Sequence, residues 1–364
     1  MENAFITEVK IHKVRHLHDI TIPLSGDYIK HLILTGKNGS GKTSILESLA
    51  IYLKHYFSED IKTPYGTEIA FASCTNVVDA YSNGQYILAY FSDHRSFKVD
   101  IPKNIESITL PAVYDISDSP SSQFAKYLVN LKTKQAFAQT QHKLDQANEI
   151  QNWFERFTGI LQKLYDDPSL QLDFDIDTFQ FHILMDGREP FDFNTMSMGY
   201  SAVFNIICDL MMRMESKRNY NMEGLVLIDE VETHLHVDLQ KKIMPILTEL
   251  FPNIQFILTT HSPFVLNSLE NAVIYDLEKH LLIENGLANL PYEGIVESYF
   301  DVDTMSKTLS DKFNQYKALL QKSSLTAKEH AELAELEMYL DEVPDYLALD
   351  FAVEYEQLKL EAGR

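Results

Sequence analysis

The stretch Gly36-Lys-Asn-Gly-Ser-Gly-Lys-Thr43 decides the fold of this chain. It fits the pattern G-x-x-x-x-G-K-[ST], it follows an apolar run at His31–Thr35, and a helical run begins at Ser44. A glycine-rich turn between a buried strand and a helix lets successive backbone N–H groups point at phosphate oxygens, and the helix dipole strengthens that attraction. The pattern therefore predicts a phosphate-binding loop (P-loop) on a central strand of an α/β fold.

The residues of this loop have separate expected roles. Lys42 is expected to reach the β- and γ-phosphates of ATP, and the hydroxyl of Thr43 is expected to bind Mg²⁺. The remaining candidates are expected to surround the phosphates with backbone and hydroxyl groups: Gly36, Asn38, Gly39, Ser40, Gly41 and Ser44. The alternative, a chance glycine-rich turn, is weakened by the full match between a strand and a helix.

A second apolar run, Leu225–Ile228, ends in the carboxylates Asp229 and Glu230. Asp229 is a candidate magnesium residue, and Glu230 is the candidate that polarises the attacking water. The alternative is a buried strand followed by a solvated pair of acids. The P-loop upstream favours the catalytic interpretation.

The segment Thr195-Met-Ser-Met-Gly-Tyr-Ser201 precedes a long apolar helical run. Small polar and glycine residues at a helix start can form another phosphate cradle, so Ser197, Met198, Gly199 and Tyr200 are candidate nucleotide contacts. Taken alone, Ser197 is more simply an N-cap residue followed by a turn glycine. Its position between the P-loop and the acidic strand favours phosphate contact.

His261 follows a third apolar run, Phe256–Thr259. A histidine just beyond a central parallel strand lies at the carboxyl edge of the sheet, where ligands bind. There it could hydrogen-bond a γ-phosphate. A lone histidine is more often structural, but the order of the four motifs supports a catalytic role.

Together these motifs resemble the ABC-type ATPase heads of the RecF, SMC and OLD class, over about residues 6–280. The run Glu232-Thr-His-Leu-His236 matches the E-x-H-L-H element of the RecF/OLD-like branch. The resemblance implies a P-loop NTPase with a RecA-like parallel sheet, an antiparallel β subdomain, an inserted helical lobe and a C-terminal helical extension. The signature departs from the Leu-Ser-Gly-Gly-Gln of transporters. No glutamine loop is assigned, and Val113-Tyr114 is only a candidate region.

The segments Arg188–Phe193, Met198–Ser201 and Thr260–Phe264 are similar to ATPases of Septu-type anti-phage systems, including those that accompany retrons. This resemblance implies an Mg²⁺-dependent ATPase that dimerises around ATP, or forms a higher oligomer, and gates a separate nuclease effector of the HNH type. Two alternatives stay open: a RecF-like DNA repair ATPase, and a non-hydrolysing scaffold that binds ATP to fix a dimer.

Charge and composition limit the classes of function. The chain has 364 residues, with 31 basic and 53 acidic side chains, for a net charge of −22. Such a surface argues against general binding to DNA or anionic membranes. The two cysteines are far apart in sequence, and we find neither a secretion signal nor a membrane-length apolar run. We therefore expect a cytoplasmic protein with no membrane contact.

We expect an ATPase head at residues 1–293, with a helical lobe at about 116–215, and a helical extension at residues 294–364. Residues 66–115 are expected to be strands and residues 121–164 helical. The range 119–144 holds four lysines (Lys126, Lys132, Lys134 and Lys143) and no acid, so it is either a solvated helix face or a contact for nucleic acid or a partner.

The tail carries no recognisable nuclease motif. Asp301-Val-Asp303 has the spacing of a nuclease dipeptide but is followed only by helical sequence, so we interpret it as a turn or cap. Residues 328–364 hold 11 acids and 3 bases, a composition suited to a basic partner. Leu333, Leu336 and Leu340 are the candidate anchors for that partner, and the alternative is that they pack inside the protein itself.

Overall fold

The computed structural model describes residues 4–58, 66–72, 77–95, 97–100, 102, 104–290, 292–295, 307–322, 324–343 and 349–361. The chain separates into two compact units, Met1–Leu290 and Pro291–Arg364. The dipeptide Asp301-Val-Asp303 lies outside the described residues. Within the described part of the chain, no helix is both long enough and apolar enough to cross a membrane.

A six-stranded sheet forms the centre of the first unit, in the order β12-β11-β3-β10-β9-β5. Its strands are β3 (His31–Thr35), β5 (Tyr86–Phe91), β9 (Glu223–Ile228), β10 (Ile254–Thr259), β11 (Ala272–Asp276) and β12 (Leu281–Ile283). Every neighbouring pair is parallel except β11–β12. Strands β3 and β10 are buried along their whole length, as the apolar runs predicted, because helices cover both faces of a parallel sheet.

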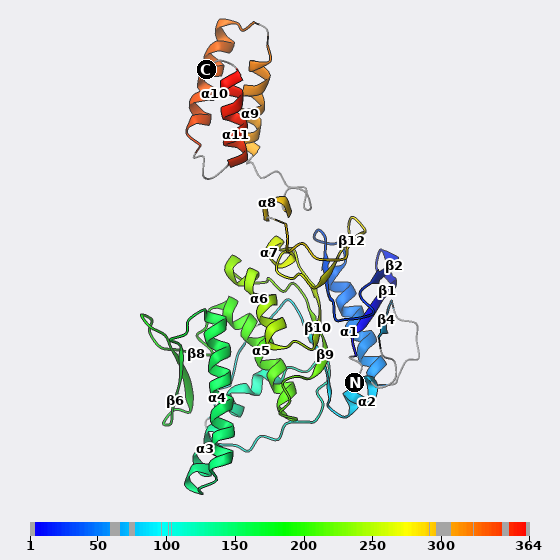
Figure 1. Cartoon of the computed structure of the whole chain (residues 1–364), viewed down its shortest axis with the longest axis vertical. Coiled ribbons are helices and arrows are strands. Elements are labelled where there is room, and N and C mark those ends of the chain that lie inside the picture. The colour runs from blue at the N-terminus through cyan, green and yellow to red at the C-terminus, as the bar shows by residue number, and fades with distance from the viewer. Residues whose placement is uncertain are drawn as a thin grey trace. The chain divides into compact units, whose positions relative to one another are not determined.

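Helix α1 (Lys42–Phe57) packs on one face of this sheet, and α5 (Met198–Glu215) and α6 (Val237–Leu250) lie on the other (Figure 1). Beyond α1 is an antiparallel sheet of β1 (Ile6–Val14), β2 (Leu17–Pro23) and β4 (Thr67–Phe71), in the order β2-β1-β4. One hydrophobic core joins this small sheet, α1 and one face of the parallel sheet. The α/β fold with a parallel core and an antiparallel β subdomain is thus confirmed.

The helical lobe contains the turn η1 (Pro120–Gln123), α3 (Phe124–Thr140) and α4 (Leu144–Tyr165). The predicted apolar face of α3 is buried at Phe124, Tyr127, Leu128 and Leu131. A break at residues 141–143 divides the expected single helical stretch into two. A third sheet follows, built from β6 (Gln171–Asp175), β7 (Gln180–Leu184) and β8 (Phe191–Asp192).

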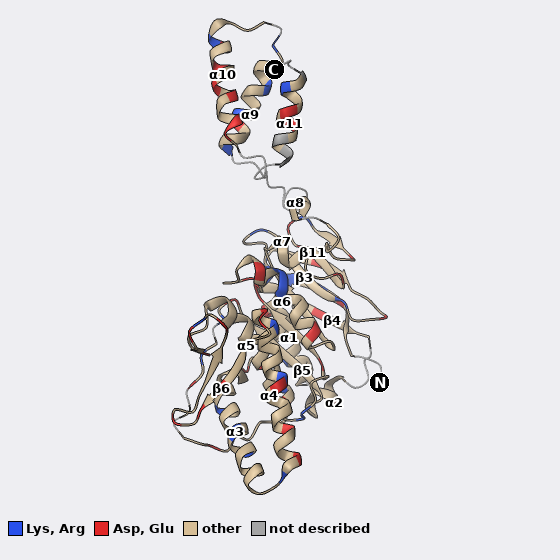
Figure 2. Ribbon diagram, turned by 60° about the vertical axis from the view of Figure 1, so that its left-hand side comes forward, with Lys and Arg blue, Asp and Glu red and all other residues tan. Residues whose placement is uncertain are grey.

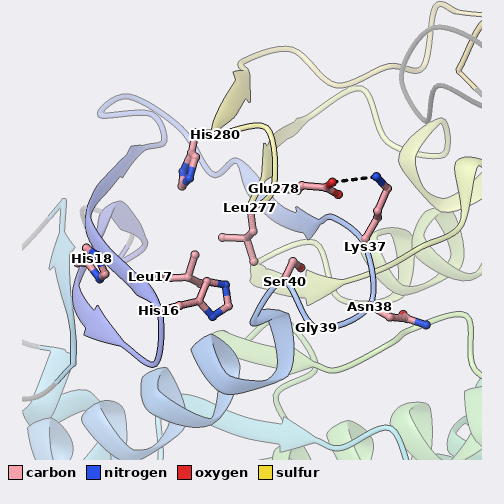
Figure 3. A pocket seen from close by; sticks show the side chains of 10 residues that line it. All are labelled: His16, Leu17, His18, Lys37, Asn38, Gly39, Ser40, Leu277, Glu278 and His280. Carbon is pink, nitrogen blue, oxygen red and sulfur yellow. Dashed lines mark hydrogen bonds and ion pairs between the residues drawn. The ribbon is translucent and has the colours of Figure 1, made fainter.

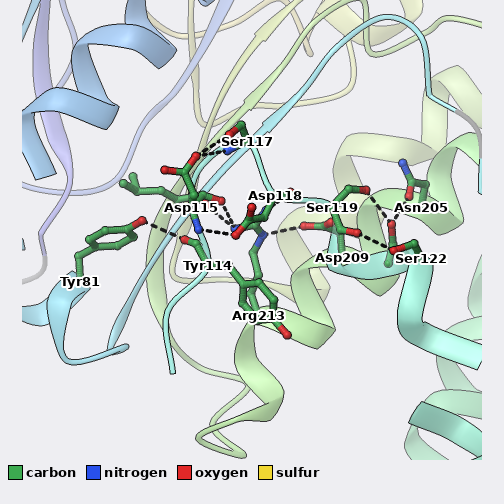
Figure 4. A network of polar contacts seen from close by, with 12 residues as sticks. Tyr81, Tyr114, Asp115, Ser117, Asp118, Ser119, Ser122, Asn205, Asp209 and Arg213 are labelled. Atoms are coloured by element: carbon green, nitrogen blue, oxygen red, sulfur yellow. Dashed lines mark hydrogen bonds and ion pairs between the residues drawn. The ribbon is translucent and has the colours of Figure 1, made fainter. Parts of the chain in front are cut away.

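The prediction of strands within residues 66–115 is confirmed for β4 and β5, but it is wrong for the rest of that range. Between β4 and β5 the structure has helix α2 (Val77–Ser82), and the described residues from 92 to 118 contain no strand. Arg213 of α5 holds this segment, because its guanidinium donates to the carbonyls of Asp115 (3.0 Å) and Asp118 (2.5 Å) (Figure 4). The same side chain forms a buried ion pair with Asp209, 2.7 Å from Nε to Oδ1.

The second unit contains α8 (Tyr292–Gly294), α9 (Lys307–Leu320), α10 (Ala327–Asp341) and α11 (Leu349–Glu361). Thr326 and Glu329 form a capping box at the start of α10. A core of its own joins α9, α10 and α11, and it includes Leu333, Leu336 and Leu340. The proposal that these leucines anchor a partner is therefore wrong, because all three are buried inside the unit.

Candidate nucleotide-binding site

Three neighbouring strands bring the predicted site residues to the carboxyl edge of the parallel sheet. The P-loop follows β3, Asp229 and Glu230 follow β9, and His261 comes two residues after β10. Because β3, β10 and β9 are adjacent and parallel, their ends meet at one edge. Segments from three distant parts of the sequence thus converge on one site. The short helix α7 (Pro263–Leu266) follows His261.

Three P-loop glycines have positive φ (Gly36, Gly39 and Gly41), and at two of them a side chain would also collide with its neighbours. Gly36 and Gly41 have φ of 137° and 100°, in the region that residues with a Cβ rarely adopt. A Cβ atom on Gly36 would lie 2.9 Å from the Ser40 hydroxyl, and one on Gly41 would lie 2.7 Å from Cδ1 of Leu17. The tight turn therefore depends on the absence of side chains at both positions.

The side chain of Lys42 hydrogen-bonds back to the first residues of the P-loop. Its Nζ donates to the carbonyls of Gly36 (2.8 Å) and Lys37 (3.2 Å), and the residue is buried. Burial lowers the pKa of Lys42, and the nearby carboxylate of Glu230 opposes that shift. The side chains of Asn38 and Thr43 are exposed, as is the backbone at Gly39, and Ser44 is partly buried. The loop thus offers hydroxyl and N–H groups at the surface, with one cation held beside them.

One carboxylate oxygen of Asp229 makes no hydrogen bond to the described residues. Its Oδ1 accepts a hydrogen bond from Thr259 Oγ1 at 2.6 Å, whereas Oδ2 is buried with no hydrogen-bond partner within the described part of the chain. A buried, unpaired carboxylate oxygen is costly unless a ligand satisfies it. Together with the exposed Thr43 hydroxyl, it fits Mg²⁺, which is usually bound by few protein oxygens plus phosphate and water. The described residues contain no group of three His, Cys, Asp or Glu able to bind a metal.

Glu230 and His261 face one another across the site. The distance from Glu230 Oε1 to His261 Nε2 is 3.9 Å. Burial lowers the pKa of His261, and the Lys42 ammonium lowers it further. Glu230 has φ of 42°, an unusual conformation for glutamate, which its backbone N–H supports by donating to Thr259 Oγ1 at 2.7 Å. The site therefore pairs a carboxylate with a neutral imidazole.

Arg95 and Glu232 also belong to this site, although the sequence did not single them out as site residues. Arg95, four residues after β5, is buried and donates to the carbonyls of Asp229 (2.5 Å) and Glu230 (2.7 Å). Glu232 accepts the backbone N–H of His261. Nothing in the sequence marks Arg95, whereas the E-x-H-L-H element contains Glu232. Both residues fix the backbone that carries the predicted acids and histidine.

The signature segment presents its first side chains to solvent. Ser197 occupies the N-cap position of α5, but its side chain makes no capping hydrogen bond, and Met198 is 70% exposed. Gly199 is buried against the E-x-H-L-H turn, where a Cβ would lie 2.9 Å from the His234 carbonyl oxygen. Tyr200 stacks on Tyr165 with ring centroids 4.1 Å apart. The free hydroxyl of Ser197 is thus available to a ligand outside its own helix.

The candidate glutamine-loop region, Val113-Tyr114, lies near the C-terminal end of α1, whereas the P-loop precedes the N-terminal end of that helix. The next residue, Asp115, pairs with Lys54 Nζ at 3.1 Å. Lys54 is 12 residues along α1 from Lys42, which corresponds to about 18 Å at the rise of an α-helix. Residues 113–115 therefore lie near the end of α1 opposite the P-loop.

A cavity of about 520 Å³ lies beside the P-loop (Figure 3). It is lined by His16, Leu17 and His18 from β2 and the turn before it, by P-loop residues 37–40, and by Leu277, Glu278 and His280 after β11. Lys37 and Glu278 form an ion pair across it, 2.9 Å from Nζ to Oε1. Its position and its imidazole and amide groups suit the nucleoside part of a bound nucleotide.

Comparison with known protein families shows to which family the chain belongs. The family described as "AAA domain, putative AbiEii toxin, Type IV TA system" matches residues 84–267, half of the chain. The chain belongs to this AAA ATPase family. The match extends from β5 to α7, so it includes the signature, Asp229, Glu230 and His261.

Named relatives match parts of this AAA ATPase. The chain is 36% identical over 152 residues to the "Septu protein PtuA" of Bacillus mycoides (strain KBAB4), covering 39% of this chain and 21% of that protein. It is 32% identical over 114 residues to the "Retron Ec83 probable ATPase" of Escherichia coli, covering 29% and 21% respectively. A solved SMC head bound to the C-winged helix domain of ScpA aligns with a TM-score of 0.44 and 13% identity, over 79% of this chain and 100% of that chain. The aligned segments thus span about a fifth of the two named relatives.

Proposed function

We propose that this AAA ATPase hydrolyses ATP to ADP and phosphate and uses the reaction as a switch. The observation that carries the proposal is the 3.9 Å approach of His261 to Glu230, beside the buried free oxygen of Asp229 and the ammonium of Lys42. Glu230 would orient the attacking water and His261 would hydrogen-bond the γ-phosphate. Intact acids and the P-loop lysine favour hydrolysis over a scaffold that only binds ATP.

The nucleotide would lie with its phosphates on the P-loop and its nucleoside in the cavity beside β2. Mg²⁺, bound by Thr43 and by Asp229 through water, would neutralise charge on the phosphates. Lys42 would exchange its two carbonyl partners for phosphate oxygens, because these carry full charge. Arg95 and Glu232 would hold the acids and His261 in place without contacting ATP.

We further propose that two subunits enclose two ATP molecules. The exposed, uncapped Ser197 supports this arrangement, because a signature hydroxyl directed at solvent can reach the γ-phosphate of a second subunit. In this proposal the catalytic head comprises residues 1–293, with the helical lobe at about 116–215, and the extension residues 294–364; the two compact units divide three residues earlier, between Leu290 and Pro291. The presence of a separate core in the second unit supports a distinct role for that extension.

We further propose a role in bacterial anti-phage defence, carried out in the cytoplasm. In this proposal, closure of the ATPase dimer gates a separate nuclease effector, with an HNH-type nuclease as the candidate. The similarity to Septu PtuA and to a retron ATPase supports the role. The acidic second unit offers a surface for a basic effector.

Mixing two inactive variants tests the shared site. Ser197→Arg should block closure by adding bulk and charge at the start of α5, and Lys42→Ala should remove phosphate binding. Because each shared site takes its P-loop from one subunit and its signature from the other, a mixed dimer keeps one intact site. We expect ATPase activity to reappear on mixing. If the mixture shows only the sum of the parents' activities, the shared site is wrong.

A further inference from the structure

A second cavity, of about 390 Å³, lies in the helical lobe. It is lined by Leu131 of α3, by Glu149, Ile150, Asn152, Trp153 and Arg156 of α4, and by Glu215, Arg218 and Tyr220 at and after the end of α5. Ser197 and the cavity lie at opposite ends of the 18-residue helix α5, which is about 27 Å long at 1.5 Å per residue. The cavity is therefore separate from the candidate ATP site.

The wall of this cavity is fixed by a buried carboxylate. Glu215 is 6% exposed and accepts hydrogen bonds from Trp153 Nε1 (3.1 Å), from the Tyr220 hydroxyl and from the Tyr127 hydroxyl. Trp153 Nε1 also donates to the Tyr220 hydroxyl at 2.6 Å. The indole packs in addition on Phe157, with ring centroids 5.5 Å apart. The Trp153 and Tyr220 rings are therefore held in one orientation before any ligand binds.

Two arginines, Arg156 and Arg218, line the cavity beside this aromatic wall. The Arg156 guanidinium lies 4.1 Å from the centre of the Tyr220 ring, and the side chain of Arg156 is exposed. Arg218 is 67% exposed, and its contact with Glu149 at 3.3 Å is a surface ion pair of little strength. Lys134, exposed one helical turn after Leu131, belongs to the stretch of residues 119–144 without acids. Figure 2 shows basic residues in blue, together with acidic residues in red, along α3 and α4.

We propose that this cavity binds an unpaired nucleotide, with its base against the Trp153 wall and its phosphate at Arg156 and Arg218. Fixed aromatic rings stack on a base whatever its identity, and arginine recognises phosphate. A paired base in a duplex has no free face to offer to such a wall. The same chemistry is present in a free nucleotide and in a single-stranded nucleic acid, and the experiment below separates these two sources.

The single tryptophan of the chain reports on this cavity directly. Full-length protein carrying Lys42→Ala, which weakens the P-loop site, is titrated with AMP, with a single-stranded oligothymidylate of about 12 nucleotides, and with a duplex of that length. We expect saturable quenching of Trp153 fluorescence by the single strand, by AMP or by both, and much weaker quenching by the duplex. Tighter binding of the single strand identifies nucleic acid as the source, and tighter binding of AMP identifies a free nucleotide. No quenching by either ligand, or equal binding of the duplex, overturns the proposal.

Arginine variants test the phosphate contact while the hydrogen bonds of Trp153 and Tyr220 to Glu215 stay in place. Arg156→Gln should weaken binding about tenfold and, for the single strand, should lower the slope of log affinity against log salt by about one, as loss of one phosphate contact requires. Arg156→Lys should keep most of that slope. Arg188→Gln, at an exposed arginine near β7, is the matched control and should bind as the parent does. Unchanged binding by Arg156→Gln, or equal weakening by Arg188→Gln, overturns the assignment.

Discussion

Glu230 lies in a left-handed backbone conformation next to Asp229, whose Oδ2 is unpaired, and we propose that its side chain acts where the γ-phosphate would lie. Glu230→Gln keeps the shape of the side chain but removes its basicity. We expect ATP hydrolysis to fall by about 10²–10⁴-fold while ATP binding is retained. Steady-state phosphate release and nucleotide binding measure the two effects. Glu270→Gln, at an exposed glutamate, is the control, and near-normal turnover in Glu230→Gln would contradict the assignment.

His31, on the central strand β3, is expected to make stability depend on pH. Burial lowers the pKa of His31 to about 4 from an ordinary value of 6.5, and its Nδ1 accepts the backbone N–H of Phe256 at 3.1 Å. Below pH 6.5 the unfolded chain takes up a proton that the folded chain does not, so the free energy of unfolding decreases as pH falls towards 4. The contribution of His31 approaches about 1.4 kcal/mol per pH unit in that window.

A variant separates the pH dependence of stability that His31 causes from the pH dependence that carboxylates cause. The substitution His31→Asn places an amide oxygen near the position of Nδ1 and removes the titrating group. Denaturant unfolding between pH 7 and pH 4 should therefore show a shallower decrease in stability than in the parent. His94→Asn, at an almost fully exposed histidine, should leave the decrease unchanged. Parallel pH profiles for the parent and His31→Asn would show that His31 is not the cause.

At the scale of elements, the start of α5 packs against the E-x-H-L-H turn, which follows Glu230 in the chain. This contact links the signature to the segment that carries Glu230. Gly199→Ala would force Cβ to 2.9 Å from the His234 carbonyl oxygen, so the backbone must move. We expect a loss of about 1–3 kcal/mol in stability and reduced hydrolysis. Gly159→Ala in α4 is a matched control, because its Cβ meets no atom within 4 Å. It should stabilise the protein by about 0.5–1 kcal/mol. Equal effects of the two variants in unfolding and ATPase assays would exclude the contact.

Elements with a strong local pattern could be predicted from the sequence, whereas those held by distant contacts could not. The run Phe256–Thr259 is apolar on both faces, which itself indicates a central parallel strand. The conformation of residues 92–118 depends on Arg213, nearly a hundred residues away, and no local signal marks that contact. For the same reason Arg95 was missed. In α10 the spacing of Leu333, Leu336 and Leu340 predicted an apolar face, but it could not show that α9 and α11 cover it.

At the scale of the whole molecule, the second unit is expected to guide a basic partner by charge. Its aromatic and leucine core is closed, so its surface offers acids and a few exposed apolar side chains: Met338, Val353 and Leu360. Long-range attraction from such acids raises association rates and fades with salt. A chain ending at Leu290 should therefore keep ATP binding, because Met1–Leu290 is compact by itself, yet lose capture of the proposed nuclease effector.

A charge-reversal variant tests the same prediction in a chain that keeps its second unit. Glu332 and Glu335 are exposed on α10, so Glu332→Lys with Glu335→Lys leaves the core intact. We expect association with the partner to slow about tenfold at low salt and to be nearly unchanged near 1 M salt, because the Debye length is then only about 3 Å. Glu270→Lys in the first unit is the control and should have little effect. Salt-independent binding, or undiminished capture by the chain ending at Leu290, would place the partner elsewhere. DNA cleavage by the highly purified chain alone would remove the need for a separate nuclease.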